Sequence, residues 1–388
     1  MRRISFFLCC AVLLAACSRL GNNTLPLAAP AGTAAERGHT NDYLAIYNFS
    51  GSDGAYPVGS LLVFKGELYS TTQWGGANNE GTVFAMKTDG GEQVRHSFTG
   101  ADGEKPSAGL VQYFSLLYGT TYQGGAYQGG TVFVMDHTGN LKRLHQFGRG
   151  RDGRYPQSEL LVVGDRLYGT TNYGGVYGKG TVFAITPAGQ ERVIHSFGFP
   201  LDGSLPDASL TRVGDIMYGV TLDGGAYKGG TIFSITTAGK LRVLHNFGHN
   251  FDGKGPTSEL VYFNHQLHGT TCEGGTHHGG IVFRITLTGK ETILYNFGHA
   301  LHDGTCPSSG VTVIDGSVYG TTLYGGTQGF GTVFKIGGIG LQRVIHNFTG
   351  DSDGADPFGG LTYFQGSLYG VTSSGGSHGL GTVYRIAP

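Results

Sequence analysis

Apolar and polar residues alternate over short stretches of this chain, and glycine-rich turns separate those stretches. Residues 152–197 show the pattern once in full, with strands predicted at 159–163, 166–172, 181–186 and 191–197. In the last of these strands, Val193 and His195 alternate with Ile194 and Ser196 across the two faces. The pattern therefore predicts a unit of four short antiparallel strands.

The same unit occurs seven times. Each copy carries Asp-Gly, a following Pro, a variant of Leu-Tyr-Gly-Thr-Thr, a Gly-Gly pair and a variant of Gly-Thr-Val-Phe. The Asp-Gly pairs begin at Asp53, Asp102, Asp152, Asp202, Asp252, Asp303 and Asp353. A period this regular indicates a closed or stacked array. A helical repeat would need long runs at a 3.6-residue period without glycine, and the coils of a β-solenoid are usually shorter and parallel.

The two ends of the array complement each other. The last unit stops after its third strand, at residues 381–386, and residues 44–49 match the fourth strand of the preceding unit, residues 343–348. An N-terminal strand that completes the last blade would close the ring and remove an exposed edge. The prediction is an all-β, seven-bladed β-propeller over residues 44–388, with four antiparallel strands per blade and the last blade closed by residues 44–49.

The repeat resembles the GloVer tandem-repeat family of exported bacterial proteins over residues 44–386. It is similar to kelch blades more weakly, because the kelch tryptophan near the blade end is absent. The family resemblance implies a repeat β-protein at the cell envelope and supplies no catalytic residues. Function is therefore sought where single units depart from the repeat.

The N-terminal segment predicts export and anchoring. Arg2 and Arg3 precede an apolar run at residues 4–14, and residues 14–17, Leu-Ala-Ala-Cys, resemble the lipobox of bacterial lipoproteins. By this resemblance residues 1–16 are a signal peptide, Cys17 is lipidated, and residues 17–43 form a flexible tether. Ser18 favours the outer membrane, with the protein facing the periplasm or the surface. A plain secretory signal and a buried apolar segment are the alternatives.

Composition narrows the function classes. Glycine accounts for 71 of 388 residues, and 26 basic against 27 acidic side chains leave a net charge of -1. Nucleic-acid binding therefore has no electrostatic footprint, and the lipid anchor is the only expected contact with a membrane. His-Glu-X-X-His and phosphate-loop motifs are absent from the sequence, so binding is favoured over catalysis. We expect a monomer without a cofactor.

Propeller geometry places candidate binding residues on one face. The loops between second and third strands and the crossings to the next blade share this face, named here the crossing face. Loops on a rigid scaffold often carry function, and flat aromatic rings there suit sugars or peptides. The candidate binding residues are Trp74, Tyr122, Tyr173 and Tyr324. Packing of these rings between blades is the alternative interpretation.

The repeated aspartates and histidines have structural interpretations. Asp beside Gly favours turns, and one carboxylate per blade does not supply the oxygens that Ca²⁺ needs. The repeated histidines are His96, His145, His195, His245 and His346, and two other units carry Tyr47 and Tyr295 at this register. A position that accepts either ring predicts packing rather than a ring of metal ligands.

Unit five departs most from the repeat. Cys272 and Cys306 are predicted on the crossing face, and in an oxidising compartment they favour a disulfide between the loop and the next crossing. A Zn²⁺ or copper site formed by Cys272, His277, His278, His302 and Cys306 is the second interpretation. Unpaired cysteines are the third.

The favoured function is an envelope-anchored binding module whose partner is a carbohydrate, a peptide or an envelope protein. A propeller hydrolase or lyase acting on glycans is the first alternative, and a structural surface scaffold is the second. Four non-repeated polar residues on the crossing face are candidates without assigned roles: Asp223, Glu273, His277 and His378. An enzyme should bring two or more carboxyl or imidazole groups within about 5 to 10 Å of one another.

Overall fold

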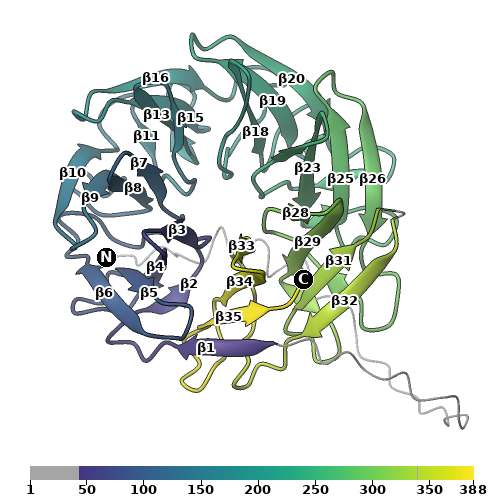
Figure 1. The fold of residues 1–388 in the computed structure, drawn as a ribbon. Helices are drawn as coiled ribbons and strands as arrows, with labels where there is room; N and C mark the ends of the chain where they lie inside the picture. Colours follow the sequence, from purple (N-terminus) through teal and green to yellow (C-terminus); the bar gives the residue numbers. More distant parts are fainter. Residues whose placement is uncertain (1–42, 339) are drawn as a thin grey trace, which may run out of the picture. The chain divides into compact units, whose positions relative to one another are not determined.

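The computed structural model describes residues 43–338 and 340–388. Seven four-stranded antiparallel blades surround a common axis, as Figure 1 shows, so the predicted seven-bladed β-propeller is confirmed. The predicted signal peptide, the lipidation site Cys17 and nearly all of the tether lie outside the described residues. Within those residues, no helix is long and apolar enough to cross a membrane.

Each blade runs from a short strand near the axis to a long strand at the rim (Figure 1). Blade 1 consists of β3 (Leu62–Phe64), β4 (Glu67–Trp74), β5 (Thr82–Met86) and β6 (Glu92–Ser97). Blade 2 consists of β7 (Val111–Tyr113), β8 (Leu116–Thr121), β9 (Thr131–Met135) and β10 (Leu141–Gln146). Blade 3 consists of β12 (Leu161–Val163), β13 (Arg166–Thr171), β15 (Thr181–Ile185) and β16 (Glu191–Ser196). Blades 4 and 5 consist of β17 (Thr211–Val213), β18 (Ile216–Thr221), β19 (Thr231–Thr236) and β20 (Leu241–Asn246); and β22 (Val261–Phe263), β23 (Gln266–Thr271), β25 (Ile281–Thr286) and β26 (Glu291–Asn296). Blades 6 and 7 consist of β28 (Thr312–Ile314), β29 (Ser317–Thr322), β31 (Thr332–Ile336) and β32 (Gln342–Asn347); and β33 (Thr362–Phe364), β34 (Ser367–Thr372), β35 (Thr382–Ile386) and β1 (Leu44–Asn48).

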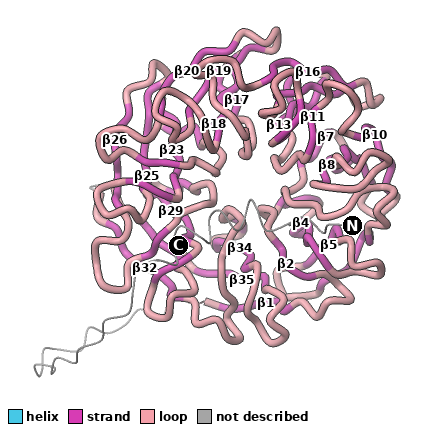
Figure 2. Tube along the Cα trace, turned by 180° about the vertical axis from the view of Figure 1, so that it is seen from behind, coloured by secondary structure: helices cyan, strands magenta, loops and turns pink. Residues whose placement is uncertain are grey.

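The ring closes through its N-terminal strand, as predicted. β1 pairs antiparallel with β35, with Leu44 opposite Arg385 and Asn48 opposite Thr382. Figures 1 and 2 both show the two strands side by side. The packed chain begins one residue earlier than the predicted boundary, because Tyr43 stacks on His346 with ring centroids 3.8 Å apart.

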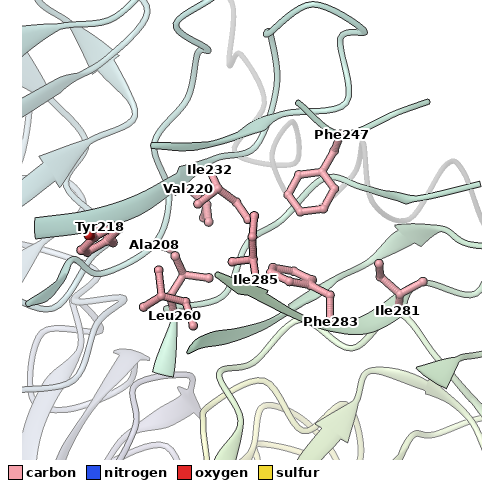
Figure 3. Packing of buried hydrophobic residues seen from close by; sticks show 10 residues of the cluster. Ala208, Tyr218, Val220, Ile232, Phe247, Leu260, Ile281, Phe283 and Ile285 are labelled. Atoms are coloured by element: carbon pink, nitrogen blue, oxygen red, sulfur yellow. The ribbon is translucent and has the colours of Figure 1, made fainter. Parts of the chain in front are cut away.

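The hydrophobic core lies between neighbouring blades, and each such interface is called a seam. Seam 4/5 joins Tyr218 and Ile232 of blade 4 to Phe283 and Ile285 of blade 5 (Figure 3). At every seam, the aromatic residue after the rim strand of one blade packs on an aromatic residue of the next blade's third strand. These pairs are Phe49–Phe84, Phe98–Phe133, Phe147–Phe183, Phe197–Phe233, Phe247–Phe283, Phe297–Phe334 and Phe348–Tyr384. The repeated Phe residues therefore hold the ring together.

The repeated aspartates and histidines meet at the rim of five seams. His145 Nε2 on β10 lies 3.1 Å from Oδ2 of Asp152, which begins the crossing to blade 3. The Asp carboxylates also accept backbone N–H groups within their turns, as Asp102 does from Thr99 at 2.9 Å. Both structural interpretations are thus parts of one contact. The phenols of Tyr47 and Tyr295 replace the imidazole at seams 7/1 and 5/6.

Candidate functional site

A short second ribbon forms the crossing face of each blade. After Asp-Gly, the crossing pairs with the extension of the blade's second strand. Four blades form these extra strands: β2 (Ala55–Pro57) with β4, β11 (Gly153–Arg154) with β14 (Tyr173–Gly174), β21 (Gly253–Lys254) with β24 (Glu273–Gly274), and β27 (Gly304–Thr305) with β30 (Tyr324–Gly325). The other three blades form single bridges at the same place, such as Glu104 with Gln123. Trp74, Tyr173 and Tyr324 therefore lie on strands, where the sequence pattern had predicted loops.

The residue before each crossing proline reaches back to the preceding blade. Tyr155 has a φ of 61°, and its N–H donates to the Gly129 carbonyl of blade 2 at 2.7 Å. Its own carbonyl accepts the N–H of Asn172 at 3.2 Å. Backbone bonds thus fix the side chain at this position directly over a seam.

Three tyrosines meet at seam 2/3. The rings of Tyr122 and Tyr155 stack with centroids 5.0 Å apart, and Tyr173 meets Tyr155 edge to face at 5.9 Å. All three are half-buried. Two of them were predicted as binding residues, and Tyr155 was missed. The signal for it was the residue before the crossing proline, which is aromatic only here and at Tyr56. The three residues are called the tyrosine cluster below.

The other two predicted aromatic residues lie elsewhere on the ring. Trp74 belongs to blade 1, and the ammonium group of Lys105 from blade 2 lies 4.5 Å from the centroid of its ring. This cation–π contact occupies one face of the indole. Tyr324 belongs to blade 6, three blades away from Tyr173, and pairs with Thr305 through the backbone. The predicted set is therefore not one surface.

A polar group adjoins the tyrosine cluster. The Asn172 side chain is fully buried, and its Nδ2 donates to Asp207 Oδ1 at 3.0 Å and to Gln157 Oε1. Its Oδ1 is buried and accepts no hydrogen bond within the described part of the chain. Burial raises the pKa of Asp207 to about 6, against the opposing effect of the Asn172 bond. Asn172, Gln157 and Asp207 are called the amide–carboxylate group below.

Two glutamates lie at the inner ends of blades 3 and 5. A side chain at Gly109 would place its Cβ 2.2 Å from Glu159 Oε1, and one at Gly310 would place its Cβ 2.7 Å from Glu259 Cγ. Each glutamate therefore lies over a glycine of a neighbouring blade. Burial, reinforced by the charge of Glu259, raises the pKa of Glu159 to about 8. Sequence reasoning placed Glu159 only as the start of a strand, although other units carry Ser or Gly at this register.

Cys272 and Cys306 form a disulfide between blades 5 and 6. They occupy the registers of Tyr122 and Tyr155 at seam 2/3. Seam 5/6 therefore has a disulfide at the position where seam 2/3 has two stacked rings. A metal held by both cysteines would need two thiolates, which the disulfide does not offer. Of the histidines in that alternative, His277 stacks on His299 with centroids 4.6 Å apart, and His278 and His302 are exposed.

The remaining polar candidates from the sequence are distributed over three blades. Glu273 of blade 5 forms an ion pair with Lys254 at 2.9 Å. Asp223 lies in blade 4 and His378 in blade 7, and both are exposed. Glu159 and Glu259 do interact, since the charge of Glu259 helps to raise the pKa of Glu159, and sequence reasoning singled out neither.

The fold and its seams define a seven-bladed propeller built from a tandem repeat. The chain belongs to the Gloeobacter/Verrucomicrobia repeat family, whose model matches residues 37–221 and again 214–384. The family resemblance seen in the sequence is thereby confirmed. The comparison with curated proteins returned no match.

Similar solved structures share the propeller fold at low sequence identity. A virginiamycin B lyase from Staphylococcus aureus is 13% identical, covers 89% of this chain and 98% of its own, and has a TM-score of 0.58. A streptogramin B lyase is 12% identical, with coverage of 89% and 96% and the same TM-score of 0.58. A puromycin hydrolase is 12% identical, with coverage of 83% and 50% and a TM-score of 0.54. At these identities the likeness shows the fold alone.

Proposed function

We propose that this protein is a binding propeller that takes a carbohydrate on its crossing face at blades 2 to 4. The single observation that carries the proposal is the junction of two chemistries in consecutive residues. Asn172 belongs to the amide–carboxylate group and Tyr173 to the tyrosine cluster, while Tyr155 and Gln157 are two residues apart in the same crossing. Apolar ring faces and planar polar groups therefore lie side by side.

Carbohydrates present the complementary pair of surfaces. The faces of sugar rings carry C–H groups that stack on aromatic side chains, and sugar hydroxyls donate to carboxylates and amides. Asp207 is ionised at neutral pH because its pKa of about 6 lies below 7, so its carboxylate can accept hydrogen bonds from sugar hydroxyls.

A glycan array tests this proposal with the purified full-length protein. Glycans retained by the wild-type protein should be lost or bound at least tenfold more weakly by Tyr155→Ala. Tyr363→Ala is the matched control, because Tyr363 is exposed on the innermost strand of blade 7, outside the proposed site. Equal retention by all three proteins would contradict the proposed site. Retention of peptides alone would contradict the proposed ligand class.

A second candidate function rests on the two glutamates at the inner ends of blades 3 and 5. Glu159 and Glu259 are close enough for one charge to raise the pKa of the other, and paired carboxyl groups with shifted pKa values serve as acid and base in glycoside cleavage. A glycan hydrolase or lyase would use them on a chain held at the crossing face. Product release from array-positive glycans by the wild-type protein, but not by Glu159→Gln, would favour this function over binding alone.

Display at the bacterial outer membrane is part of the proposal and is supported by the lipobox-like residues before Cys17. Replacement of the acceptor thiol in Cys17→Ala should move the protein from the membrane fraction to the soluble fraction. An unchanged distribution would contradict lipid anchoring.

A further inference from the structure

The rim contact between histidine and aspartate gains a third member at two seams. At seam 4/5, ligand atoms of His245, Asp252 and Glu291 all lie within 4.8 Å of one another. At seam 2/3, His145, Asp152 and Glu191 form the same arrangement. The glutamates begin β26 and β16, so each cluster combines the rim strands of two neighbouring blades with the crossing between them.

Backbone hydrogen bonds hold Asp252 in place through its Oδ1 and leave its Oδ2 directed at His245. Asp252 Oδ1 accepts the N–H groups of Gly248 and His249, both at 2.8 Å. Its Oδ2 lies 3.2 Å from His245 Nε2, and Glu291 Oε2 lies 3.8 Å from the same nitrogen. One imidazole nitrogen therefore lies near carboxylate oxygens of both Asp252 and Glu291.

The glutamate has no evident role in holding the seam. Leu141 and Leu241 occupy the same register at seams 1/2 and 3/4, where the contacts His96–Asp102 at 2.8 Å and His195–Asp202 at 2.9 Å persist. At seams 2/3 and 4/5, Oε1 of Glu191 and of Glu291 is buried without a hydrogen-bond partner in the described residues. Only 13% of the Glu291 side chain is exposed. A buried carboxylate oxygen without a donor is costly, and a cation would relieve that cost.

We infer that seams 4/5 and 2/3 each bind a divalent transition-metal ion through one histidine, one aspartate and one glutamate. An imidazole with two carboxylates suits Zn²⁺ and disfavours Mg²⁺ or Ca²⁺, which prefer all-oxygen sites. Metal binding needs an unprotonated His245 Nε2, which the Nδ1–H tautomer of the neutral imidazole supplies. Three protein ligands leave the remaining position to water.

The two sites differ in their surroundings. A surface pocket beside the seam 2/3 cluster is also lined by Arg143 and Arg149, whose charge opposes a bound cation. At seam 4/5 the register of Arg149 holds His249, which stacks on Tyr227 with centroids 4.6 Å apart. Seam 4/5 is therefore the tighter site. Both sites lie at the rim and share no residue with the proposed carbohydrate site.

Zinc stoichiometry of the full-length protein tests the inference. The protein is stripped with a chelator, titrated with Zn²⁺ by calorimetry and assayed for retained zinc after dialysis. Two equivalents are expected for the wild-type protein, one for Glu291→Leu and none for Glu191→Leu/Glu291→Leu. Leu241→Glu should add a third equivalent at seam 3/4, beside His195 and Asp202.

The leucine variants carry the residue that other seams already have, so they should fold, which circular dichroism checks. The variant His278→Ala removes an exposed imidazole outside both clusters and should leave two equivalents. No zinc binding by the folded wild-type protein, or a stoichiometry that Glu191→Leu/Glu291→Leu does not change, would overturn the inference. A stoichiometry left unchanged by Leu241→Glu would overturn the assignment of the third ligand.

Discussion

The phenol ring of Tyr43 lies flat against the imidazole ring of His346, with centroids 3.8 Å apart and planes inclined by 2°. Tyr43 precedes β1 in blade 7, whereas His346 lies on β32 in blade 6. The Tyr43 hydroxyl also donates to the carbonyl oxygen of Asp353. The first described residue therefore ties the closing strand to the neighbouring blade.

Removal of this ring should weaken the closure of the propeller. We expect Tyr43→Ala to lower the free energy of unfolding by about 1–3 kcal/mol, because it removes an aromatic stack and a hydrogen bond. Urea denaturation measures the change, and Tyr363→Ala, an exposed tyrosine of blade 7, should change the free energy by less than about 0.5 kcal/mol. Equal losses in both variants would contradict a closing role for Tyr43.

The disulfide between Cys272 and Cys306 should stabilise the seam between blades 5 and 6. The two residues are 34 positions apart, and a crosslink over such a loop stabilises a fold by about 2–4 kcal/mol. Cys272→Ala/Cys306→Ala should therefore lower the Tm, and a reductant should lower the Tm of the wild-type protein to a similar extent. The reductant should have no effect on the double variant. A wild-type Tm that does not respond to reduction would show that this bond adds no stability.

The buried Asp207 carboxyl should lower the stability of the folded protein as the pH rises. Burial raises its pKa to about 6 from an ordinary value of 3.8, so the folded protein holds a proton that the unfolded chain has already released. The penalty is absent below about pH 4, grows between pH 4 and 6, and reaches roughly 3 kcal/mol above pH 6.

The isosteric change Asp207→Asn keeps the acceptor for Asn172 and removes the charge. Its free energy of unfolding should exceed that of the wild-type protein at pH 7.5 and approach it at pH 4. Asp223→Asn, at an exposed aspartate of the same blade, should give no pH-dependent gain. A constant difference between Asp207→Asn and wild type over this range would contradict the buried, ionised state. Such a cost to stability is common for residues retained for binding.

Most of the fold could be predicted from the local sequence pattern and the repeat period. The unit at residues 152–197 was predicted within two residues at every strand end, because alternation and turn residues act over a few positions. The closing strand was predictable because residues 44–49 repeat the rim-strand pattern. The short ribbon after Asp-Gly was missed, since it depends on positive φ angles at residues such as Tyr155.

The candidate site was predicted only in part. Tyr122 and Tyr173 were found as aromatic residues of the crossing face, but their contact through Tyr155 depends on which registers face each other across a seam. Glu159 and Glu259 are 100 positions apart and approach only once the ring is closed. A comparison of registers was the signal available for both groups, because Asp207 stands where other units carry an uncharged residue and Glu159 where most carry Ser or Gly.

Calorimetric titration of a glycan identified on the array tests the central claim most directly. The carbohydrate-binding account predicts that Tyr155→Ala raises the Kd at least tenfold and that Asp207→Ala raises it similarly, because each removes one of the two chemistries of the site. Tyr363→Ala should leave the Kd within twofold of wild type. An unchanged Kd in both Tyr155→Ala and Asp207→Ala, with the fold intact by circular dichroism, would contradict the account.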